Sequence, residues 1–591
     1  MEILRLIRQR IDRLSFNLNP ACLFPETPLI HFRVQRQFCA CGEHLKVLKT
    51  RARTLSTLHI GNFNARETLA YCPRCKQHYF SEELSSLVPS QGKFGFDVIE
   101  KIGRDLFLHC HNEATIQHAF HKEKNISLSL SEIAYLGKKF IVYLALAHQA
   151  CQEHVKQYMQ AKGGYILHLD GTCEGDSPHL LCSIDEISNI VLENQKMPSE
   201  NSAQIIPFLQ RIKRAYGAPV ALVHDMGRAI LTAVKAVFPE IPDFICHYHF
   251  LKDIGKDLFE HEYDTLRRHL RIYKFSSQLR QIAKLLKQAI DQDPDRLTEL
   301  NRCLASKHQH VFFDALAPVT KAYLLTSWVL EARRACHGFG FPFDRMHFAC
   351  YLRLQQAYPV LKKLKPQLDK GLLSLAFMSN VLTDPALLST VERMAEKVAV
   401  FDQLRQAMRI ALPEQQHGLN NNGDSDIKTI AEAVTQFCQS IEVKQSENHQ
   451  PCYQKMLKQI DTYRDKLFAD PIKVQTPAGE ITLQPQRTNN IMEQFFRDEK
   501  RGLRKKSGNT SLSKTLKAMF SDTPLVKNLN HPEYMHILLK GKSCLAERFV
   551  DIDIKQVRQE FEKEQVQLEK YPKGMSCVFK IPDLPEKLDN L

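Results

Sequence analysis

Strand-like and helix-like patterns alternate between residues 163 and 260, and this alternation constrains the fold more than any other feature of the sequence. Strands are indicated by short apolar stretches bounded by turn residues, in YILHLDGT, HLLCSIDEISNIVLEN and APVALVHDMG. Amphipathic helices that end near Gly217 and Pro239 are indicated by ENSAQIIPFLQRIKRAYG and RAILTAVKAVFP. Strands that alternate with helices predict an α/β layer in which at least some strands pair in parallel.

An aspartate stands at the carboxyl end of two of these strands. Asp170 is followed by Gly-Thr and Asp225 by Met-Gly, and ligands bind outside such strand ends in open α/β sheets. A single aspartate at a strand end is more often a turn or capping residue, so the functional interpretation rests on the pair. Asp185, in SIDEIS, is a rival acid that we interpret as a hairpin-turn residue.

A third carboxylate, Glu493, lies on a helix predicted after residue 481. Arg497, Arg501 and Arg504 follow it at intervals of 4, 4 and 3 residues, which places these side chains on one helical face. Hard cations such as Mg²⁺ prefer carboxylate oxygens, and two such ions can drive an in-line displacement at phosphorus. Asp170, Asp225 and Glu493 together therefore predict a magnesium centre. A solvated glutamate paired with Arg497 is the alternative for Glu493.

Basic residues continue beyond this glutamate in the run KRGLRKKSGN, which includes Lys505. The run predicts contacts with a nucleic-acid backbone, each of which adds salt-dependent affinity. A solvated basic face is the alternative. The formal charge of +14 for the whole chain allows a polyanionic partner but does not require one.

Four cysteines form two closely spaced pairs near the amino terminus. The first pair has the spacing C-x-C and the second, about thirty residues later, has C-x-x-C; the residues are Cys39, Cys41, Cys72 and Cys75. Two such thiolate pairs can close a tetrahedral structural Zn²⁺ site that holds together a module with a small core. Because C-x-C is the less usual spacing, His44 and His78 remain alternatives for one thiolate. The 17 cysteines of the chain fit reduced thiols and metal ligation better than a disulfide framework.

The pattern between about 93 and 160 is helical and resembles a helix-turn-helix. Its third helix is expected to begin at an N-cap Ser131 and to present Tyr135, Lys138 and Lys139 to a DNA groove. Any small helical bundle has a similar pattern, which is the alternative. The triplet from His109 to His111 sits on a helix with its side chains diverging, and we assign it no metal.

The length of 591 residues exceeds what one core holds, so several domains are expected. A polar stretch at 413–427 is interpreted as a flexible connection within a mostly helical region. We divide the chain into six parts. A terminal helix and zinc-binding module is expected at 1–90, a helical domain at 91–160 and the first part of the core at 161–260. An all-helical insertion follows at 261–480, the last part of the core at 481–530 and a tail at 531–591.

No apolar run approaches the roughly 20 residues that a membrane span needs. The longest, FIVYLALA at 140–147, is too short, so no membrane partner is expected. The amino-terminal MEILRLIRQRIDRL lacks the features of a secretory signal, and we interpret it as an amphipathic helix of a cytoplasmic protein.

Four short motifs follow one another along the chain: LHLDGT, LVHDMG, CHYH (Cys246 to His249) and RTNNIMEQFF. Their order and placement resemble the DDE-type transposases with a ribonuclease H-like core, above all the Mutator-like group and its bacterial insertion-sequence relatives. In that group two aspartates end core strands, a C-x-x-H pair follows the second, and a glutamate comes last, beyond an all-helical insertion. The separations of 55 residues between the aspartates and 268 to the glutamate fit this pattern.

The resemblance implies a ribonuclease H-like mixed sheet core, interrupted by a large all-helical insertion and preceded by a zinc-ribbon-like module and a helix-turn-helix-like domain. It implies that Asp170, Asp225 and Glu493 bind two Mg²⁺ or Mn²⁺ ions, hydrolyse a phosphodiester at an element end and join the freed 3′-hydroxyl to target DNA. The implied partners are double-stranded DNA, at element ends and target, and further copies of the chain assembled on it. In a bacterium such a protein is cytoplasmic and associated with the nucleoid.

Some assignments within the resemblance stay open. Asp498 and Glu499 lie on the same helix as Glu493, so each is a rival third carboxylate. Cys246 and His249 match the C-x-x-H pair, with a structural or metal-associated role near the active site; a buried thiol and an ordinary core imidazole are the alternative. Two other functions also remain: a domesticated transposase that binds DNA without catalysis, and a ribonuclease H-like nuclease without strand joining.

Overall fold

The computed structural model describes residues 19–305, 315–332, 337–412, 427–447, 450–508, 511–568, 578 and 581–589. The predicted amino-terminal helix and most of the predicted connection at 413–427 lie outside these ranges. The chain divides into two compact units. The first, here called the α/β unit, comprises Met1–Asp243, Ile472–Leu483 and Asn489–Leu591. The second, the helical unit, comprises Phe244–Pro471 and Gln484–Thr488. None of the helices in the described ranges combines the length and the apolar character that crossing a bilayer requires.

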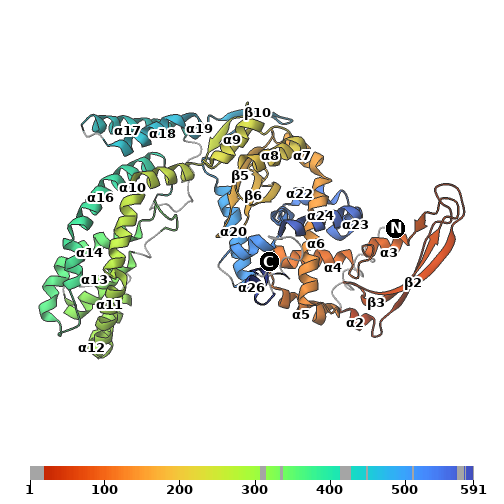
Figure 1. Ribbon diagram of the computed structural model, residues 1–591, viewed down its shortest axis with the longest axis horizontal. Coiled ribbons are helices and arrows are strands. Elements are labelled where there is room, and N and C mark those ends of the chain that lie inside the picture. The colour runs from red at the N-terminus through yellow and green to blue at the C-terminus, as the bar shows by residue number, and fades with distance from the viewer. Residues whose placement is uncertain are drawn as a thin grey trace. The chain divides into compact units, whose positions relative to one another are not determined.

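A five-stranded mixed sheet, ordered β7-β6-β5-β8-β9, lies at the centre of the α/β unit (Figure 1). Strand β5 pairs in parallel with β8 and antiparallel with β6, which in turn pairs antiparallel with β7. The elements are β5 Ile166–Thr172, β6 His179–Asp185, β7 Val191–Met197, α8 Ser202–Tyr216, β8 Ala221–His224, α9 Arg228–Val237 and β9 Asp243–Ile245. The predicted alternation of strands and helices and the partly parallel pairing are therefore confirmed.

The two parallel strands are apolar because they are covered on both faces. The first five residues of β5 and all four of β8 are buried, which explains their continuous apolar sequences. Asp185, at the end of β6, accepts hydrogen bonds from the backbone N–H groups of Ile187 and Ser188. Its predicted role as a hairpin-turn residue is confirmed.

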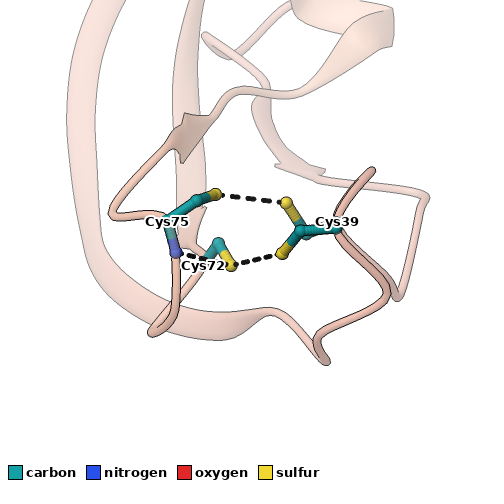
Figure 2. Close-up of side chains that lie close together, drawn as sticks. Cys39, Cys72 and Cys75 are labelled. Carbon is teal, nitrogen blue, oxygen red and sulfur yellow. Dashed lines mark hydrogen bonds between the residues drawn. The ribbon is translucent and has the colours of Figure 1, made fainter.

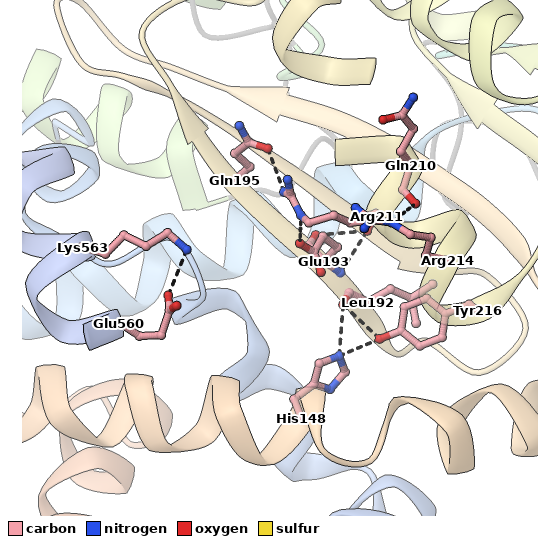
Figure 3. A network of polar contacts seen from close by, with 11 residues as sticks. His148, Leu192, Glu193, Gln195, Gln210, Arg211, Arg214, Tyr216, Glu560 and Lys563 are labelled. Atoms are coloured by element: carbon pink, nitrogen blue, oxygen red, sulfur yellow. Dashed lines mark hydrogen bonds and ion pairs between the residues drawn. The ribbon is translucent and has the colours of Figure 1, made fainter. Parts of the chain in front are cut away.

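Helix α6, Leu130–Gln149, is the buried axis of the α/β unit, and all its residues from Phe140 to His148 are buried. The Nδ1 atom of His148 is 2.8 Å from the hydroxyl of Tyr534, and Nε2 is 2.8 Å from the hydroxyl of Tyr216 and 3.0 Å from the Leu192 carbonyl oxygen. Burial lowers the pKa of His148 to about 4, so the imidazole is neutral at physiological pH. This one side chain ties α6 to β7 and to the end of α8 (Figure 3).

The start of α6 differs from the prediction. The N-cap is Ser129, not Ser131: its hydroxyl accepts from the Glu132 N–H at 3.2 Å, and the Glu132 carboxylate accepts from the Ser129 N–H at 2.9 Å. This reciprocal pair is a capping box, which requires a glutamate or glutamine three residues after the N-cap. Glu132 stands at that distance from Ser129 and directly follows Ser131.

The segment between the two cysteine pairs is a long antiparallel hairpin. Strands β2 and β3 form it, β1 pairs in parallel with β3, and β4 pairs antiparallel with the end of β3. The elements of this part of the chain are α2 Pro20–Leu23, β1 Leu29–Arg33, β2 Lys46–Thr57, β3 Gly61–Tyr71, β4 His78–Tyr79, α3 Glu82–Leu87, α4 Phe96–Gly103, the π-helical turn η1 Arg104–Leu108, α5 Glu113–Lys124 and α7 Gln152–Ala161.

The carboxyl-terminal segment, expected as a tail, contributes to the main core. Side chains from three of its helices are buried there, among them Tyr534, Leu538, Phe549 and Val557. The elements that complete the α/β unit are β10 Ile472–Thr476, β11 Gly479–Leu483, α20 Asn490–Ser507, α21 Ser513–Ala518, the 3₁₀ segment η5 Thr523–Asn530, α22 Pro532–Leu539, α23 Leu545–Val550, α24 Ile554–Leu568 and α26 Leu584–Asp589. The antiparallel hairpin of β10 and β11 falls partly in the range expected to be all-helical.

The helical unit contains α10 His247–Ile272, α11 Phe275–Asp291, α12 Pro294–Ala305, α13 Pro318–Glu331, α14 Met346–Leu364, the 3₁₀ turn η3 Lys365–Gln367, α15 Ala376–Thr383, α16 Pro385–Ala407, α17 Ile427–Glu447, α18 Pro451–Thr462 and α19 Arg464–Leu467. Its longest helix, α10, packs against α14 and α16 with buried residues at helical spacing, including Phe250, Leu251, Ile254 and Leu258. Helix α10 crosses the boundary expected at 260, so the helical unit begins earlier than the sequence indicated.

We expect Ser129→Ala to destabilise the first turn of α6 by about 1 kcal/mol, because it removes the hydroxyl that accepts the Glu132 N–H. Amides at the start of α6 should then exchange hydrogen about fivefold faster, as measured by hydrogen-exchange mass spectrometry. Ser131→Ala is the matched control and should leave exchange unchanged. Equal effects of the two substitutions would contradict the assigned cap.

Candidate metal-binding and catalytic sites

The four predicted zinc ligands come together in the α/β unit. The sulfur atoms of Cys39, Cys41, Cys72 and Cys75 all lie within 4.8 Å of one another. Figure 2 shows two facing pairs, in which Cys39 Sγ is 3.4 Å from Cys75 Sγ and Cys41 Sγ is 3.5 Å from Cys72 Sγ. Tetrahedral coordination with Zn–S bonds of about 2.3 Å separates the sulfurs by about 3.8 Å. The cluster therefore has the dimensions of a four-thiolate site and can bind a metal such as zinc.

The β2–β3 hairpin explains how the two pairs meet. Lys46 at the start of β2 is in register with Tyr71 at the end of β3, so residues just outside the open end of the hairpin lie close together. The apolar cluster around the thiols has only four buried residues, Cys39, Leu45, Ala70 and Cys72. A core of this size is small, and a bound metal would add the cross-link that stabilises it.

Hydrogen bonds change the acidity of these thiols. The Cys41 backbone N–H and the Tyr79 hydroxyl, 3.0 Å away, lower the pKa of Cys39 to about 6. The Gln77 backbone N–H lowers the pKa of Cys75, but the thiols of Cys39, Cys72 and Cys41 and burial together raise it to about 11. Four thiols at this separation cannot all ionise without a cation, and a divalent ion would supply that positive charge.

The two histidine alternatives lie outside this group of ligands. The group consists of cysteines alone, and the His44 ring packs edge-on against Phe38 with 5.3 Å between the ring centroids. The arrangement favours the set of four cysteines over sets that include His44 or His78.

Asp170 and Asp225 lie at matching positions on two neighbouring parallel strands. In the β5–β8 pairing, Ile166 is opposite Ala221 and His168 is opposite Val223, a constant offset of 55 residues. The same offset separates Asp170 from Asp225, so the spacing in the sequence is the register of the sheet. The Gly171 N–H donates to Asp170 Oδ1 at 2.8 Å, and the Gly227 N–H donates to Asp225 Oδ1 at 3.0 Å. One oxygen of each carboxylate is thereby held by the backbone.

Helix α20 brings Glu493 to the same end of β5. Its N-cap residue, Asn489, is fully buried and donates from Nδ2 to the Leu169 carbonyl oxygen at 2.8 Å. The Asn489 Oδ1 atom is also 2.8 Å from His168 Nδ1. Because these contacts are made to the two residues before Asp170, they fix the first turn of α20, and with it Glu493, beside the strand end.

The electrostatics of Asp170 identify its neighbours. Burial raises its pKa well above the ordinary value, and the negative charges of Asp225, Glu493 and Glu200 raise it further. The rival acids Asp498 and Glu499 are not among the acids that raise this pKa most. Asp498 pairs with Arg501 at 3.8 Å, and burial raises the pKa of Glu499 to about 7, against the lowering effect of Lys527. These interactions favour Glu493 over Asp498 and Glu499 as the third carboxylate.

The carboxylates are spread more widely than the thiols. Among the described residues, the cysteine cluster is the only group of three or more potential ligand atoms that lie within 4.8 Å of one another. In a two-metal centre the ions are themselves about 3.5–4 Å apart, so ligands on opposite sides need not approach each other. The donors here are all oxygens, which are the ligands that Mg²⁺ and Mn²⁺ prefer.

Glu200 is a fourth carboxylate that the sequence analysis missed. It lies in the loop between β7 and α8, and burial together with the charge of Asp225 raises its pKa. Its local sequence, MPSENSAQ, is polar and resembles an ordinary helix start, and Asn201 next to it is indeed the N-cap of α8. Only the folded chain brings it to the aspartates.

The C-x-x-H pair belongs to the helical unit. Cys246 is fully buried and is the N-cap residue of α10, and His249 lies in the first turn of that helix. Between them, His247 has a structural role: its Nε2 is 2.5 Å from the Leu467 carbonyl oxygen, and its backbone N–H donates to the Arg487 carbonyl at 2.9 Å. No group of metal ligands in the described residues includes Cys246 or His249, and their role stays a prediction.

The predicted DNA-contacting residues lie in two different environments. On α6 the three side chains contact aromatic rings within the unit: Tyr135 packs on Phe561, Lys138 lies over Phe520 and Lys139 lies over Tyr135. Since α6 is also the buried axis of the unit, it does not stand out as a separate recognition helix. On α20, by contrast, the basic side chains are exposed; they are Arg497, Arg501, Arg504 and Lys505.

Comparisons with known proteins were made for the whole sequence. No protein-family model matches it, and no curated protein is significantly similar to it.

We expect the purified protein to contain about one zinc ion per chain, measured by elemental analysis, because four cysteine ligands fill one tetrahedral site. Cys72→Ser should lose this metal. Cys22→Ser, which changes an exposed cysteine outside the cluster, is the control and should retain it, as should His44→Ala and His78→Ala. A metal-free protein with an intact β2–β3 hairpin would contradict the assignment.

Proposed function

We propose that this protein is a DDE-type transposase with a ribonuclease H-like core, which cleaves DNA at the ends of a mobile element and joins the freed ends to target DNA. The observation that carries the proposal is the meeting of Asp170, Asp225 and Glu493 at the carboxyl ends of β5 and β8. A buried carboxylate among other negative charges is costly, and functional sites are where such arrangements concentrate. The strand order β7-β6-β5-β8-β9, with two antiparallel strands on one side of a parallel pair, is consistent with the ribonuclease H-like interpretation.

The chain's own residues prepare the site for a hard divalent cation. Asp170 is more than nine-tenths buried, and none of the ion pairs among the described residues involves Asp170 or Asp225. Their negative charge therefore lacks a lysine or arginine partner, and the all-oxygen donor set fits Mg²⁺ or Mn²⁺. Asp170, Asp225 and Glu493 would hold the two ions. When bound, these ions activate a water or 3′-hydroxyl for attack and stabilise the leaving oxygen.

The reaction needs no energy source beyond DNA itself. In the first step water attacks phosphorus, the bond from phosphorus to the 3′-oxygen breaks, and a 3′-hydroxyl is released. In the second step this hydroxyl attacks a phosphodiester of the target and displaces its 3′-oxygen, so one phosphodiester replaces another. The backbone N–H groups of Gly171 and Gly227 fix the carboxylates in one orientation during both steps, which avoids reorganising them for each attack.

Basic residues near the two sites support DNA as the partner. The exposed arginines of α20 follow Glu493 along the helix and would contact backbone phosphates of DNA bound at the site. The four-cysteine module is also strongly basic: residues 29–80 contain nine lysines and arginines and two acidic residues. We assign this module and the helices that follow it to binding of the element ends, with further copies of the chain on paired ends.

We expect Asp170→Asn, Asp225→Asn and Glu493→Gln each to lower Mg²⁺-dependent strand cleavage by at least about a hundredfold, because each removes a charged metal ligand. The measurement is cleavage and joining of labelled DNA that carries the element ends. Asp498→Asn is the matched control on the same helix, since this exposed acid is not among the neighbours of Asp170, and it should retain activity. Full activity of the three site variants would overturn the proposal.

The same assay separates the alternatives. Cleavage without joining would indicate a nuclease. Specific binding to element ends without any cleavage, at wild-type level in the three site variants, would indicate a DNA-binding protein derived from a transposase.

The basic face of α20 gives a separate prediction. We expect replacement of Arg497, Arg501 and Arg504 by Gln to reduce the dependence of DNA affinity on salt, by about 0.9 in logarithmic slope for each phosphate that the variant no longer binds. Binding isotherms at several salt concentrations measure this slope. A triple Gln variant of Lys362, Lys363 and Lys365, exposed cations of the helical unit, is the control for overall charge. An unchanged slope in the α20 variant would place the DNA elsewhere.

A further inference from the structure

Glu200 lies close to both aspartates, although it comes from a third segment of the chain. Strand β7 ends at Met197 and α8 begins at Ser202, so the short loop between them carries Glu200 towards the ends of β5 and β8. The nearest basic group to its carboxylate is His179, whose Nδ1 is 3.9 Å from Glu200 Oε2, beyond hydrogen-bonding distance.

The absence of a side chain at Gly227 leaves space that the Glu200 carboxylate occupies, and Gly171 lies next to the same carboxylate. A β-carbon added to Gly227 would lie 2.8 Å from Glu200 Oε1 and 3.1 Å from Asp225 Oδ1. A β-carbon added to Gly171 would lie 3.7 Å from Glu200 Oε2. The two distances at Gly227 place Glu200 Oε1 less than 6 Å from Asp225 Oδ1. Gly171 directly follows Asp170 and Gly227 stands two residues after Asp225, so the backbone next to the aspartates also lies against the Glu200 carboxylate.

The Asp170 carboxylate is repelled by the neighbouring carboxylates, and it forms no ion pair with any described residue that would offset this repulsion. Asp170 is 8% exposed, its Oδ1 accepts one backbone hydrogen bond, and its Oδ2 accepts none from any described residue. An ionised carboxylate offers several acceptor positions, and leaving them empty in a buried site is unfavourable. A cation bound between the carboxylates would satisfy the open oxygen and cancel the repulsion together.

We propose that Glu200 is a fourth carboxylate of the metal centre, which shares an ion with Asp225 across the space left by Gly227. This inference rests on the proposed function, because it assigns Glu200 to the same centre. It goes beyond the three acids that the sequence indicates, and it gives Gly227 a role: this glycine keeps a side chain out of the space between Glu200 and Asp225.

Metal binding by the full-length protein without DNA tests the proposal directly. Mn²⁺ is the probe, and the free ion is measured by electron paramagnetic resonance during a titration. We expect Glu200→Gln to weaken binding of one Mn²⁺ by at least about tenfold. The matched control is Glu240→Gln, which removes the same charge from an exposed position and should leave the affinity unchanged.

The melting temperature of the metal-free protein gives a second measurement. If Glu200 only stabilised the fold, its replacement would lower this temperature, whereas a metal ligand predicts the opposite change. If Glu200 only repels its neighbours until an ion is bound, Glu200→Gln should keep or raise the melting temperature of the metal-free protein and should lose part of the increase that Mn²⁺ produces. A lower melting temperature with unchanged Mn²⁺ affinity would overturn the proposal.

Gly227→Ala tests the geometry without changing any charge. Its φ of −55° is ordinary for alanine, so the backbone is not strained, but the new methyl group must displace the Glu200 and Asp225 oxygens. Weaker Mn²⁺ binding is expected. If the wild-type protein binds no Mn²⁺, both the proposed function and this role are wrong. If the wild type binds Mn²⁺ and Glu200→Gln binds it equally well, only the role of Glu200 is wrong.

Discussion

The carboxamide of Asn489 is the interaction on which the arrangement of the candidate active site depends. It contacts the Leu169 carbonyl and the His168 ring, across 320 and 321 residues of sequence. Both partners are buried, so breaking these contacts would leave polar groups without partners, at a cost of about 1–3 kcal/mol each. One buried side chain therefore determines which part of α20 faces the strand that ends in Asp170.

The two candidate sites follow a common physical rule. In each site, acidic side chains of one kind lie close together and accept hydrogen bonds from backbone N–H groups. Their ionised forms repel one another, and this repulsion opposes the close approach. Thiols gather at the open end of the β2–β3 hairpin, where the apolar cluster is small. Carboxylates gather at the ends of β5 and β8, where the surrounding core is large and can maintain the strain. A cation would relieve repulsion in both sites, but only the cysteine module is expected to need it for folding.

The sequence predicted the parts of this structure that depend on local pattern. Buried parallel strands require continuous apolar residues, which made β5 and β8 recognisable, and the 55-residue spacing of the aspartates is the register of those strands. The four cysteines are recognisable because the ligands of such metal sites come in close pairs.

The remaining features depend on contacts that no local pattern records. The sequence around Glu200 is typical of a helix start. The outer half of β2 is exposed on both faces, so this half of the strand lacks the alternation of apolar and polar residues that indicates a strand. The N-cap of α6 was misplaced because two serines stand within two residues, and only the pairing with Glu132 distinguishes them.

The α/β unit is assembled from three separate stretches of chain, with the helical unit encoded between them. A ribosome therefore completes most of the helical unit before it has made Asn489 and the helix that follows. Until that point, the Leu169 carbonyl and the His168 ring have no partner from α20, and the last carboxylate has not been synthesised. A nascent or truncated chain can thus fold many of its helices while it still lacks the acidic centre. The order of residues along the chain therefore delays assembly of the proposed acidic centre until the ribosome has made Glu493.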